Sequence, residues 1–521
     1  MTDGKPIVCI LGLPGQLYLA RAFAKEFDRP VIGIVNWARL EEHLTTEWRA
    51  VFANIHSLPD FYLQQLPAIE KLSRAELDRQ QAALEEKFNI PTSALLTSYD
   101  RGLRWTGDYM KVRRYQLATL QFVDRFLSET EPAFMIDGVV TYLQHVLRAA
   151  CRKRNIPYLL TAHTRTLENV CLTHDDGQQV GLPETFDALQ KGQIDVLPPS
   201  VLAEADRLFN EFVNRPATPA YEKQLSETGI NFARFFKKVA WVLREENIRP
   251  SEKITLTDRS LGYESHPVLS LYSGLRSKYR IFVQKILRTL DDNPDMEQPF
   301  FYLPLHYAPE VSDLYFGAPY DHHAGFVSQL AKHLPSDTIL YVKEHTAMVG
   351  RRPVSFYSEL NKIYNVKMIA PSVSTFSIIR KARATVTVTG TAGWEAYLLG
   401  RPVIALGDVF YNFLPGVLHA PVGNGLAARI KSYLQDFADN PLARRNAFRA
   451  YYGTALGVIQ GDMSMNVTAE TVADNAAAYA RALRLFLEKW GHTIDGAFPP
   501  DMKTGHPKEM AVAKILQSGS K

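Results

Sequence analysis

Two stretches of the chain, about residues 5–200 and 296–418, contain short apolar runs separated by segments of helical periodicity. In the first stretch the apolar runs lie at 5–12, 30–36 and 133–138, and the pattern between about 38 and 130 is helical. Strands that are apolar along their whole length are typical of parallel sheets covered by helices on both faces. The pattern therefore predicts an α/β fold built from strand–helix–strand units.

The second stretch begins with the apolar run PFFYLPLHY at 299–307 and continues in a β-α-β-α-β order between Ile339 and Gly407. Between the two stretches, charged helical segments are interrupted by prolines. We therefore expect two Rossmann-like domains, each with a parallel sheet, and a helical segment between them. The expected boundaries are 1–200 for the N-terminal domain, 201–295 for a helical bridging segment, 296–460 for the C-terminal domain, 461–495 for a helix that packs back on the molecule, and 496–521 for a loose tail.

Length and composition agree with two globular domains. The 521 residues exceed the ~250–300 residues at which a single hydrophobic core stops growing. Hydrophobic residues make up 46% and charged residues 22% of the chain, which excludes a disordered protein. The formal net charge of +4 is small for this length, so we expect no nucleic-acid partner.

Cysteine usage and hydropathy favour a cytoplasmic protein. Cys9, Cys151 and Cys171 lack metal-ligand spacing and cannot all pair, which is typical of reduced thiols in a cytosolic protein. The N-terminal segment MTDGKP opens with an acidic residue instead of a basic region followed by a long apolar one. No run approaches the ~18 apolar residues that a membrane-spanning helix needs. We therefore expect a protein that does not span the membrane.

The most informative motif is the loop formed by Gly390, Thr391, Ala392 and Gly393. It joins the predicted strand ATVTVTG to the predicted helix TAGWEAYLLG. The first turn of a helix offers free N–H groups and the positive end of the helix dipole to an anion. Small residues at this turn let a phosphate approach the backbone. The loop therefore predicts a phosphate site.

Polar residues accompany two earlier elements of the same stretch. Lys343, Glu344 and His345 follow the run TILYV directly, and Ser374 and Thr375 precede the helical segment FSIIRKA. Parallel strands bind ligands at their carboxyl ends, where lysine and histidine can donate to phosphate oxygens. A solvated lysine, a histidine that caps the next turn, and an N-cap hydroxyl would also explain these residues. Together with the loop, the pattern outlines a nucleotide-sugar site.

These motifs resemble those of the bacterial capsule and surface-polysaccharide biosynthesis proteins that include the Kdo transferases, which are GT-B glycosyltransferases. The resemblance implies a GT-B-like arrangement, in which the parallel sheets of two Rossmann-like domains face a cleft. The matching segments, in one order, are PLHYAPE at 304–310, VKEH at 342–345, PSVST at 371–375 and TVTGTAGWEAYLLGRPVIALGDVFY at 387–411. The resemblance covers about the C-terminal third of the chain strongly and the first 170 residues only in general pattern. One departure is Thr346, which stands where the family pattern has proline.

The resemblance implies roles for three further residues. His306 and Glu310 lie in the loop that faces the interdomain cleft of GT-B proteins, where they would contact the sugar or phosphate. An imidazole beside a carboxylate is also a common structural pair. Glu395, expected in the first turn of its helix, would accept hydrogen bonds from ribose, although an acidic residue there also fits the helix dipole alone. The predicted donor-binding set is His306, Lys343, Glu344, His345, Ser374, Thr375, Gly390, Thr391, Ala392, Gly393 and Glu395.

The base that deprotonates the acceptor is expected from the N-terminal domain. Asp137 ends the strand AFMI, where a catalytic carboxylate of a parallel sheet would project. His163 and Glu168 follow the next strand, YLLTA, and are rivals. With Glu310 added, the catalytic candidates are Asp137, His163 and Glu310.

No metal site is expected, because the chain has no Asp-x-Asp motif and no cysteine cluster. The adjacent His322 and His323 would point in different directions on a helix or strand.

The leading interpretation is a metal-independent glycosyltransferase of bacterial surface (capsular) polysaccharide biosynthesis. The resemblance implies a CMP-activated donor such as CMP-Kdo, with a UDP-sugar left open, and a glycan or lipid-linked acceptor. No cofactor besides the nucleotide sugar is expected. Two alternatives stay open: a polyol-phosphate transferase or UDP-GlcNAc 2-epimerase-like enzyme on the same fold, and a non-catalytic capsule assembly or export component.

Two segments combine aromatic and aliphatic residues with a surplus of Lys and Arg: FARFFKKVAWVLR at 232–244 and LRSKYRIFVQKILR at 275–288. This composition is typical of a helix lying in the plane of an anionic bilayer. It is equally typical of an amphipathic helix packed on the protein with its basic face in water. Because acceptors of surface polysaccharides are commonly lipid-linked at the inner leaflet, we expect peripheral contact with the anionic inner membrane.

Overall fold

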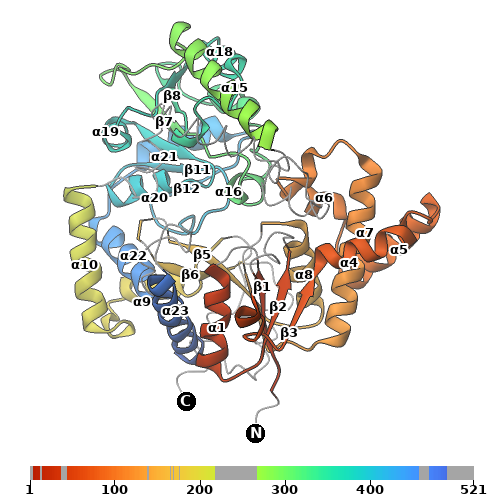
Figure 1. The fold of residues 1–521 in the computed structure, drawn as a ribbon. Helices are drawn as coiled ribbons and strands as arrows, with labels where there is room; N and C mark the ends of the chain where they lie inside the picture. The colour runs from red at the N-terminus through yellow and green to blue at the C-terminus, as the bar shows by residue number, and fades with distance from the viewer. Residues whose placement is uncertain are drawn as a thin grey trace. The chain divides into compact units, whose positions relative to one another are not determined.

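The computed structural model describes residues 4–11, 15–36, 44–137, 140–164, 166–167, 169–174, 177–216, 267–456 and 469–489. These residues form two compact units, each with its own sheet (Figure 1). Unit 1 comprises the described residues up to 174 together with 455–456 and 469–489. Unit 2 comprises residues 177–216 and 267–454.

The sheet of unit 1 has six strands in the order β3-β2-β1-β4-β5-β6. All neighbouring strands are parallel except β5 and β6, which are antiparallel. This is the strand order of the Rossmann fold, in which the winding direction reverses between β1 and β4. The strands are β1 (Ile7–Leu11), β2 (Val31–Val35), β3 (Asn54–Ser57), β4 (Phe134–Asp137), β5 (Tyr158–His163) and β6 (Val170–Thr173).

Helices cover this sheet, and their ends follow local sequence signals. Ser73 and Glu76, for example, form a capping box at the start of α5, which satisfies two backbone N–H groups. The last described helix, α23, packs on α1: Arg484 Nε lies 2.6 Å from Glu26 Oε1. The helices are α1 (Gly15–Phe27), α3 (Thr46–Arg49), α4 (Leu58–Ile69), α5 (Arg74–Phe88), α6 (Ser93–Tyr99), η1 (Leu103–Trp105), α7 (Tyr109–Glu129), α8 (Tyr142–Lys153) and α23 (Ala469–Lys489).

Unit 2 repeats the same winding with six parallel strands in the order β12-β11-β10-β7-β8-β9. Its winding direction reverses between β7 and β10. Strands β10 and β11 are buried along their whole length, as expected when helices cover both faces. The strands are β7 (Phe300–Pro304), β8 (Ile339–Lys343), β9 (Val366–Ile369), β10 (Ala384–Thr387), β11 (Val403–Ala405) and β12 (Val417–His419).

In unit 2, helix α22 packs on both α9 and α10, which lie far from it in the sequence. Arg449 Nη2 lies 2.6 Å from Asp206 Oδ2 across the α22–α10 contact. Helix α15 lies beside α18 (Figure 1). The helices are α9 (Leu182–Gln190), η2 (Ile194–Val196), α10 (Pro199–Asn214), α15 (Pro267–Ile286), α16 (Val311–Leu314), α17 (His323–Ala331), η3 (Thr346–Met348), α18 (Val354–Leu360), α19 (Thr375–Lys381), α20 (Thr391–Leu398), α21 (Leu426–Asp436) and α22 (Pro441–Gly453).

The predicted α/β class with two Rossmann-like sheets is confirmed. The helical pattern expected between about 38 and 130 was incomplete, because β3 lies there. Its four residues, Asn-Ile-His-Ser, are exposed or half-exposed at the edge of the sheet, so no apolar run marks them. The antiparallel β6 was also not expected.

Some expectations concern residues outside the described part of the chain, namely the helix at 232–244 and the tail at 496–521. Of the expected bridging segment, the described helices α10 and α15 belong to unit 2. None of the described helices has the length and apolar character needed to cross a membrane.

Candidate functional site

The carboxyl ends of β8, β7 and β10 bring the main predicted residues of unit 2 to one edge of the sheet. Lys343 at the end of β8 pairs in register with Pro304 at the end of β7, and β10 lies on the other side of β7. With strands ~4.8 Å apart, the ends of β8 and β10 are about 10 Å apart. The loops after these strands carry His345, His306 and Gly390. Open α/β sheets bind their ligands at this edge, where the winding direction reverses.

His306 spans the reversal point between β7 and β10. Its Nε2 accepts a hydrogen bond from the backbone N–H of Thr389 at 3.3 Å, so the ring proton lies on Nδ1. The Thr389 hydroxyl donates to the carbonyl oxygen of Ser312 at 2.7 Å. The N–H of Gly390 donates to Thr387 Oγ1, also at 2.7 Å. These bonds fix the loop that leads into α20.

Helix α20 begins directly after this loop, at Thr391. Gly390 occupies the N-cap position and makes no side-chain capping bond. Its carbonyl oxygen accepts from the hydroxyl of Tyr411 at 2.7 Å, which ties the start of the helix to the protein. The first-turn N–H groups, at Thr391, Ala392 and Gly393, give this end of the helix a partial positive charge. An anion such as a phosphate is the ligand that such an end favours.

The structure corrects two expectations, the one for Gly393 and the one for Glu395. A Cβ atom at Gly393 would lie 2.3 Å from Tyr411 Oη and 2.8 Å from Thr387 Cγ2. The missing side chain therefore gives room for α20 to pack on β10, and only the backbone N–H of Gly393 can face a phosphate. Glu395 is buried and is the fifth residue of α20, past its first turn. The expected first-turn position was wrong because the helix begins at Thr391.

Lys343 and His345 add hydrogen-bond donors at the end of β8. Lys343 Nζ donates to Thr375 Oγ1 at 2.6 Å. His345 Nδ1 accepts from the N–H of Ala347 at 3.2 Å, so the histidine caps η3 and carries its proton on Nε2. Burial, with the nearby charges of Arg352 and Lys343, lowers the pKa of His345 to about 4. At neutral pH its side chain is therefore an uncharged imidazole with one N–H to donate.

The two hydroxyls of the PSVST segment have different roles. Ser374 is the N-cap of α19, since its Oγ accepts from the N–H of Ser377 at 3.4 Å. The prediction that one of the pair caps the helix is confirmed. Thr375 instead receives the hydrogen bond of Lys343.

Arg352 is the centre of a buried polar network that the sequence analysis missed. Its Nε lies 2.8 Å from Glu344 Oε2, and its Nη2 donates to the carbonyl oxygen of His306 at 3.1 Å. The same Nη2 lies 2.7 Å from His323 Nδ1. Because arginine can only donate, Nδ1 of His323 accepts, and its Nε2–H donates to Asp313 Oδ1 at 2.7 Å. The network links the loops after β7 and β8.

Glu344 belongs to this network instead of to a ligand site. It is 1% exposed, and its Oε2 also accepts from the hydroxyl of Tyr357 at 2.8 Å. Its Oε1 accepts from the N–H of His345 at 2.7 Å. Burial, and then the charge of Glu344, raises the pKa of Tyr357. The expectation that Glu344 contacts the donor was wrong, because both carboxylate oxygens are engaged inside the protein.

Removing Arg352 is expected to destabilise unit 2 strongly. Arg352→Ala leaves the buried charge of Glu344 without its partner, which costs about 3–5 kcal/mol. For a unit of this size, a loss of 3–5 kcal/mol corresponds to a fall in Tm of roughly 6–20 °C. Thermal unfolding followed by circular dichroism measures the change.

The matched control is Arg351→Ala, which removes the exposed neighbouring guanidinium and should leave Tm nearly unchanged. The double variant Arg352→Met/Glu344→Gln removes both charges and should recover part of the loss. An equal fall in the single and double variants would contradict the pairing of the two charges.

Among the catalytic candidates, Glu310 is exposed and immediately precedes α16, and its Oε2 accepts from Ser312 Oγ at 3.1 Å. The buried histidine–carboxylate pair near this loop is His323 with Asp313. His163 ends β5, but its side chain is not among those described, and Glu168 lies outside the described residues.

Asp137 occupies the corresponding edge of unit 1. It ends β4 beside β1, at the point where the winding direction reverses, and is half-buried. The side-chain amide of Gln144, in the first turn of α8, donates to Asp137 Oδ2. Gln144 Oε1 in turn accepts from the N–H of Thr141 at 2.7 Å, and Thr141 Oγ1 accepts from Asn36 Nδ2 at 2.9 Å. The carboxylate is therefore held in one orientation at the carboxyl end of the sheet.

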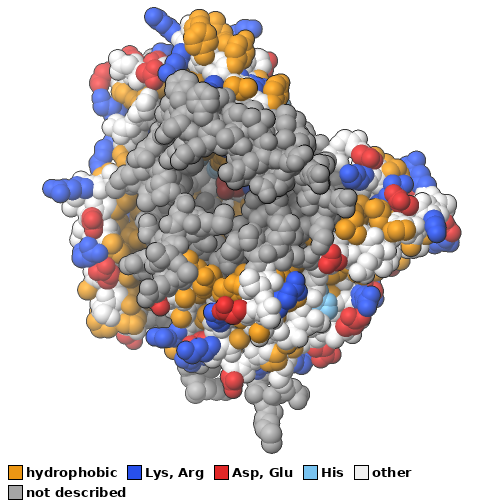
Figure 2. All heavy atoms as spheres, in the orientation of Figure 1, with side chains coloured by type: hydrophobic (Ala, Val, Ile, Leu, Met, Phe, Trp, Pro, Cys, Tyr) orange, Lys and Arg blue, Asp and Glu red, His pale blue; other side chains and the backbone are white. Residues whose placement is uncertain are grey.

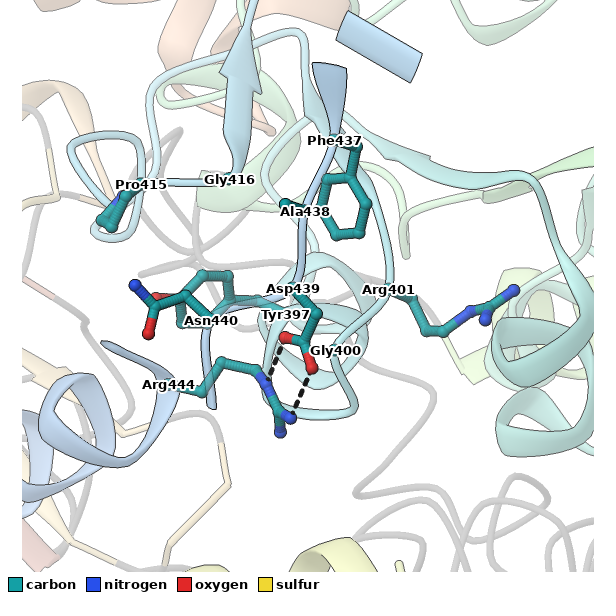
Figure 3. Close-up of a pocket in the computed structure, with 10 residues that line it drawn as sticks. All are labelled: Tyr397, Gly400, Arg401, Pro415, Gly416, Phe437, Ala438, Asp439, Asn440 and Arg444. Carbon is teal, nitrogen blue, oxygen red and sulfur yellow. Dashed lines mark hydrogen bonds and ion pairs between the residues drawn. The ribbon is translucent and has the colours of Figure 1, made fainter. Parts of the chain in front are cut away.

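A small pocket lies at the opposite edge of unit 2, where β11 begins (Figure 3). Its cavity volume is only about 10 Å³, room for about one water molecule. Asp439 and Arg444 neutralise each other there, with Nε–Oδ1 and Nη2–Oδ2 distances of 2.7 and 2.8 Å. This pocket is therefore not a candidate for the nucleotide. Among the residues that the structure describes, no group of three or more His, Cys, Asp or Glu is placed to hold a metal ion.

Comparison with solved structures finds similar chains at low identity. KpsC, the beta Kdo 2,7 transferase of Thermosulfurimonas dismutans, is 10% identical, with a TM-score of 0.33 over 63% of this chain and 79% of that chain. A second KpsC structure from this organism, the beta Kdo 2,4 transferase, is 16% identical, with a TM-score of 0.28 over 61% and 79%. UDP-GlcNAc 2-epimerase from Neisseria meningitidis, bound to UDP-GlcNAc, is 11% identical, with a TM-score of 0.22 over 85% and 97%. With TM-scores below 0.5, these similarities carry no information on the activity of this chain.

The family comparison concerns unit 2. No curated protein matches the chain, but residues 301–419 match the family model described as capsule polysaccharide biosynthesis protein. The matched segment runs from β7 to β12 and contains His306, Lys343, His345, Arg352 and all of α20. For residues 301–419, the match confirms the predicted relationship of this chain to the capsule polysaccharide biosynthesis proteins.

Proposed function

We propose that this protein is a glycosyltransferase of bacterial surface polysaccharide biosynthesis, which transfers a sugar from a nucleotide-activated donor to a glycan or lipid-linked acceptor. The observation that carries the proposal is the row of hydrogen-bond donors at the carboxyl edge of unit 2. Lys343 ends β8, His345 follows it, and the first turn of α20 follows the loop after β10. The family match over residues 301–419 supports the proposed role in polysaccharide biosynthesis.

The donors suit the chemistry of sugar transfer. When the bond between sugar and phosphate breaks, negative charge accumulates on the departing phosphate, and groups placed beforehand around that phosphate stabilise the transition state. Lys343 supplies a full positive charge, His345 an uncharged N–H donor, and α20 the positive end of its dipole. Because these protein groups compensate the phosphate charge, we propose that the reaction needs no metal ion, and turnover should be unchanged in EDTA.

The acceptor hydroxyl must lose its proton as the new bond forms, and Asp137 is the base that we propose. Its carboxylate is half-buried at the end of β4 and is oriented by the amide of Gln144. Glu310, exposed and far less constrained by its neighbours, is the weaker candidate.

The function is tested first by nucleotide binding. CMP, UDP, GDP and CDP are compared by thermal shift, because a ligand that binds the native state raises its stability by an amount that grows with the logarithm of the ligand concentration divided by Kd. The sugar forms of the stabilising nucleotide are then incubated with and without glycan acceptors, and the products are identified by mass spectrometry. We expect CMP to give the largest shift.

Transfer that depends on an acceptor would support the proposal. Conversion of a nucleotide sugar without any acceptor would instead assign an epimerase-like reaction. Glycan binding without turnover of any donor would assign the protein to capsule assembly or export.

A further inference from the structure

Helix α15 carries a stripe of large apolar side chains that face solvent. Tyr272, Leu275, Tyr279, Phe282 and Ile286 are 59%, 50%, 68%, 62% and 62% exposed. At 3.6 residues per turn, these five positions fall within about 80° of the helix circumference. They therefore form one continuous stripe, and Figure 2 shows hydrophobic side chains gathered over α15, with lysine and arginine side chains beside them.

The opposite face of α15 holds the helix on unit 2. A Cβ atom at Gly350 would lie 2.7 Å from the carbonyl oxygen of Ser277 and 2.8 Å from Ile281 Cγ1, so these residues pack tightly on the Gly350 loop. Gln284, one turn further along, is buried. Ser277, Ile281 and Gln284 centre about 170–180° from the apolar stripe. The stripe is thus not the surface that packs on the protein.

Positive charges border the stripe. Residues 267–290 contain five basic residues and no Asp or Glu, and the basic residues are Arg276, Lys278, Arg280, Lys285 and Arg288. Around the helix axis, Lys278 and Lys285 lie on one side of the stripe, and Arg276 lies on the other. Arg276 also lies over the ring of Tyr272, 5.6 Å from its centroid. The apolar side chains therefore project with cations on both sides of them.

We propose that this face of α15 docks on the surface of an anionic lipid bilayer. A helix with a one-sided apolar stripe and cations along its borders lies in the plane of the membrane interface. The apolar side chains enter the headgroup region, and the cations contact the anionic headgroups. Pairing of this face with a second copy would bring two sets of cations together without compensating acids, so charge favours the bilayer. The proposal goes beyond sugar transfer and does not depend on it.

The test is co-sedimentation of the full chain with vesicles of phosphatidylcholine containing increasing amounts of phosphatidylglycerol. The apolar variant is Leu275→Ser/Phe282→Ser/Ile286→Ser, and its control replaces three other exposed leucines, as Leu63→Ser/Leu95→Ser/Leu442→Ser. The charge variant is Arg276→Glu/Lys285→Glu, and its control is Lys332→Glu/Lys431→Glu, which changes the net charge equally at exposed sites away from α15. Circular dichroism checks that all four variants fold.

We expect binding that rises with the anionic fraction and falls in high salt. Both α15 variants should lose at least ~10-fold in vesicle partitioning, because each removes one of the two contributions to binding, while both controls bind like the wild type. A polarity-sensitive fluorophore offers an independent readout. The three native cysteines are buried, so the label should react with an introduced cysteine. Emission should increase on vesicles for Leu275→Cys and stay constant for Leu442→Cys.

Vesicle binding that does not increase with the phosphatidylglycerol fraction, or that is equal in the α15 variants and their controls, would overturn the proposal. A dimer in lipid-free solution that the apolar variant abolishes would also overturn it, and would assign the stripe to a second copy of the chain. Sedimentation velocity of the wild type and the apolar variant detects that case.

Discussion

Lys343→Ala is expected to slow sugar transfer by at least ~10²-fold, the usual effect of removing one donor that stabilises a transition state. The lysine ends β8, is only half-buried, and donates to the hydroxyl of Thr375 at 2.6 Å. A hydrogen bond with a charged group contributes only about 1.5–3 kcal/mol to folding, so the variant should stay folded. Its charge matters most when the departing phosphate gains negative charge. The loss should therefore appear in kcat more than in KM.

The matched control is Lys367→Ala on the neighbouring strand β9. Lys367 pairs with Asp291 at 2.7 Å on the surface, where an ion pair contributes little, and we expect wild-type turnover. His345→Ala should also slow transfer by about 10²-fold, since it removes the uncharged donor at the same edge. Wild-type turnover in a folded Lys343→Ala protein would remove this lysine from the site.

Asp137→Asn is expected to slow transfer by ~10²- to 10⁴-fold, the range for loss of a general base. Asparagine has the shape of aspartate and can still accept from the amide of Gln144, so the surrounding hydrogen bonds are preserved. It cannot take a proton from the acceptor. Because the donor residues of unit 2 are untouched, the affinity for the nucleotide should not change, and isothermal titration beside steady-state kinetics separates the two effects.

Asp78→Asn provides the control, because Asp78 is an exposed carboxylate paired with Arg113 at 2.7 Å and has no proposed role in transfer. If Asp137→Asn turns over like the wild type, the base lies elsewhere. His163→Ala is then the next variant, since His163 ends the adjacent strand β5.

Several parts of the fold were readable from local sequence. The largely apolar runs of β1, β7 and β8 predict buried parallel strands, because a strand covered on both faces has few polar positions. The loop at Gly390 was readable for a similar reason: a strand, small residues and a helix follow one another without interruption. The N-cap at Ser374 was also found, since a capping hydroxyl acts on N–H groups only two or three residues away.

Contacts between residues distant in sequence were not readable. Arg352 joins Glu344, His306 and His323, and no periodicity marks that pairing. Glu344 lies between Lys343 and His345 in the sequence, yet its side chain is buried. Gly393 was predicted to make room for a ligand, whereas Tyr411 fills the space from 18 positions further along the chain. In each case a partner supplied by another element decided the role.

The sequence by itself determined the α/β class, the strands that end at the candidate site, and the positions of Lys343 and His345 at the end of β8, because strand burial and helix starts depend on residues close together in the chain. Only the tertiary structure decided that His306 bridges β7 and β10, that Glu344 is an internal partner of Arg352, and which side of α15 faces solvent. The composition of α15 is the same whether its apolar side packs inward or outward. The stripe is exposed because the opposite face of α15 packs on the Gly350 loop, and only the folded chain brings that loop to the helix.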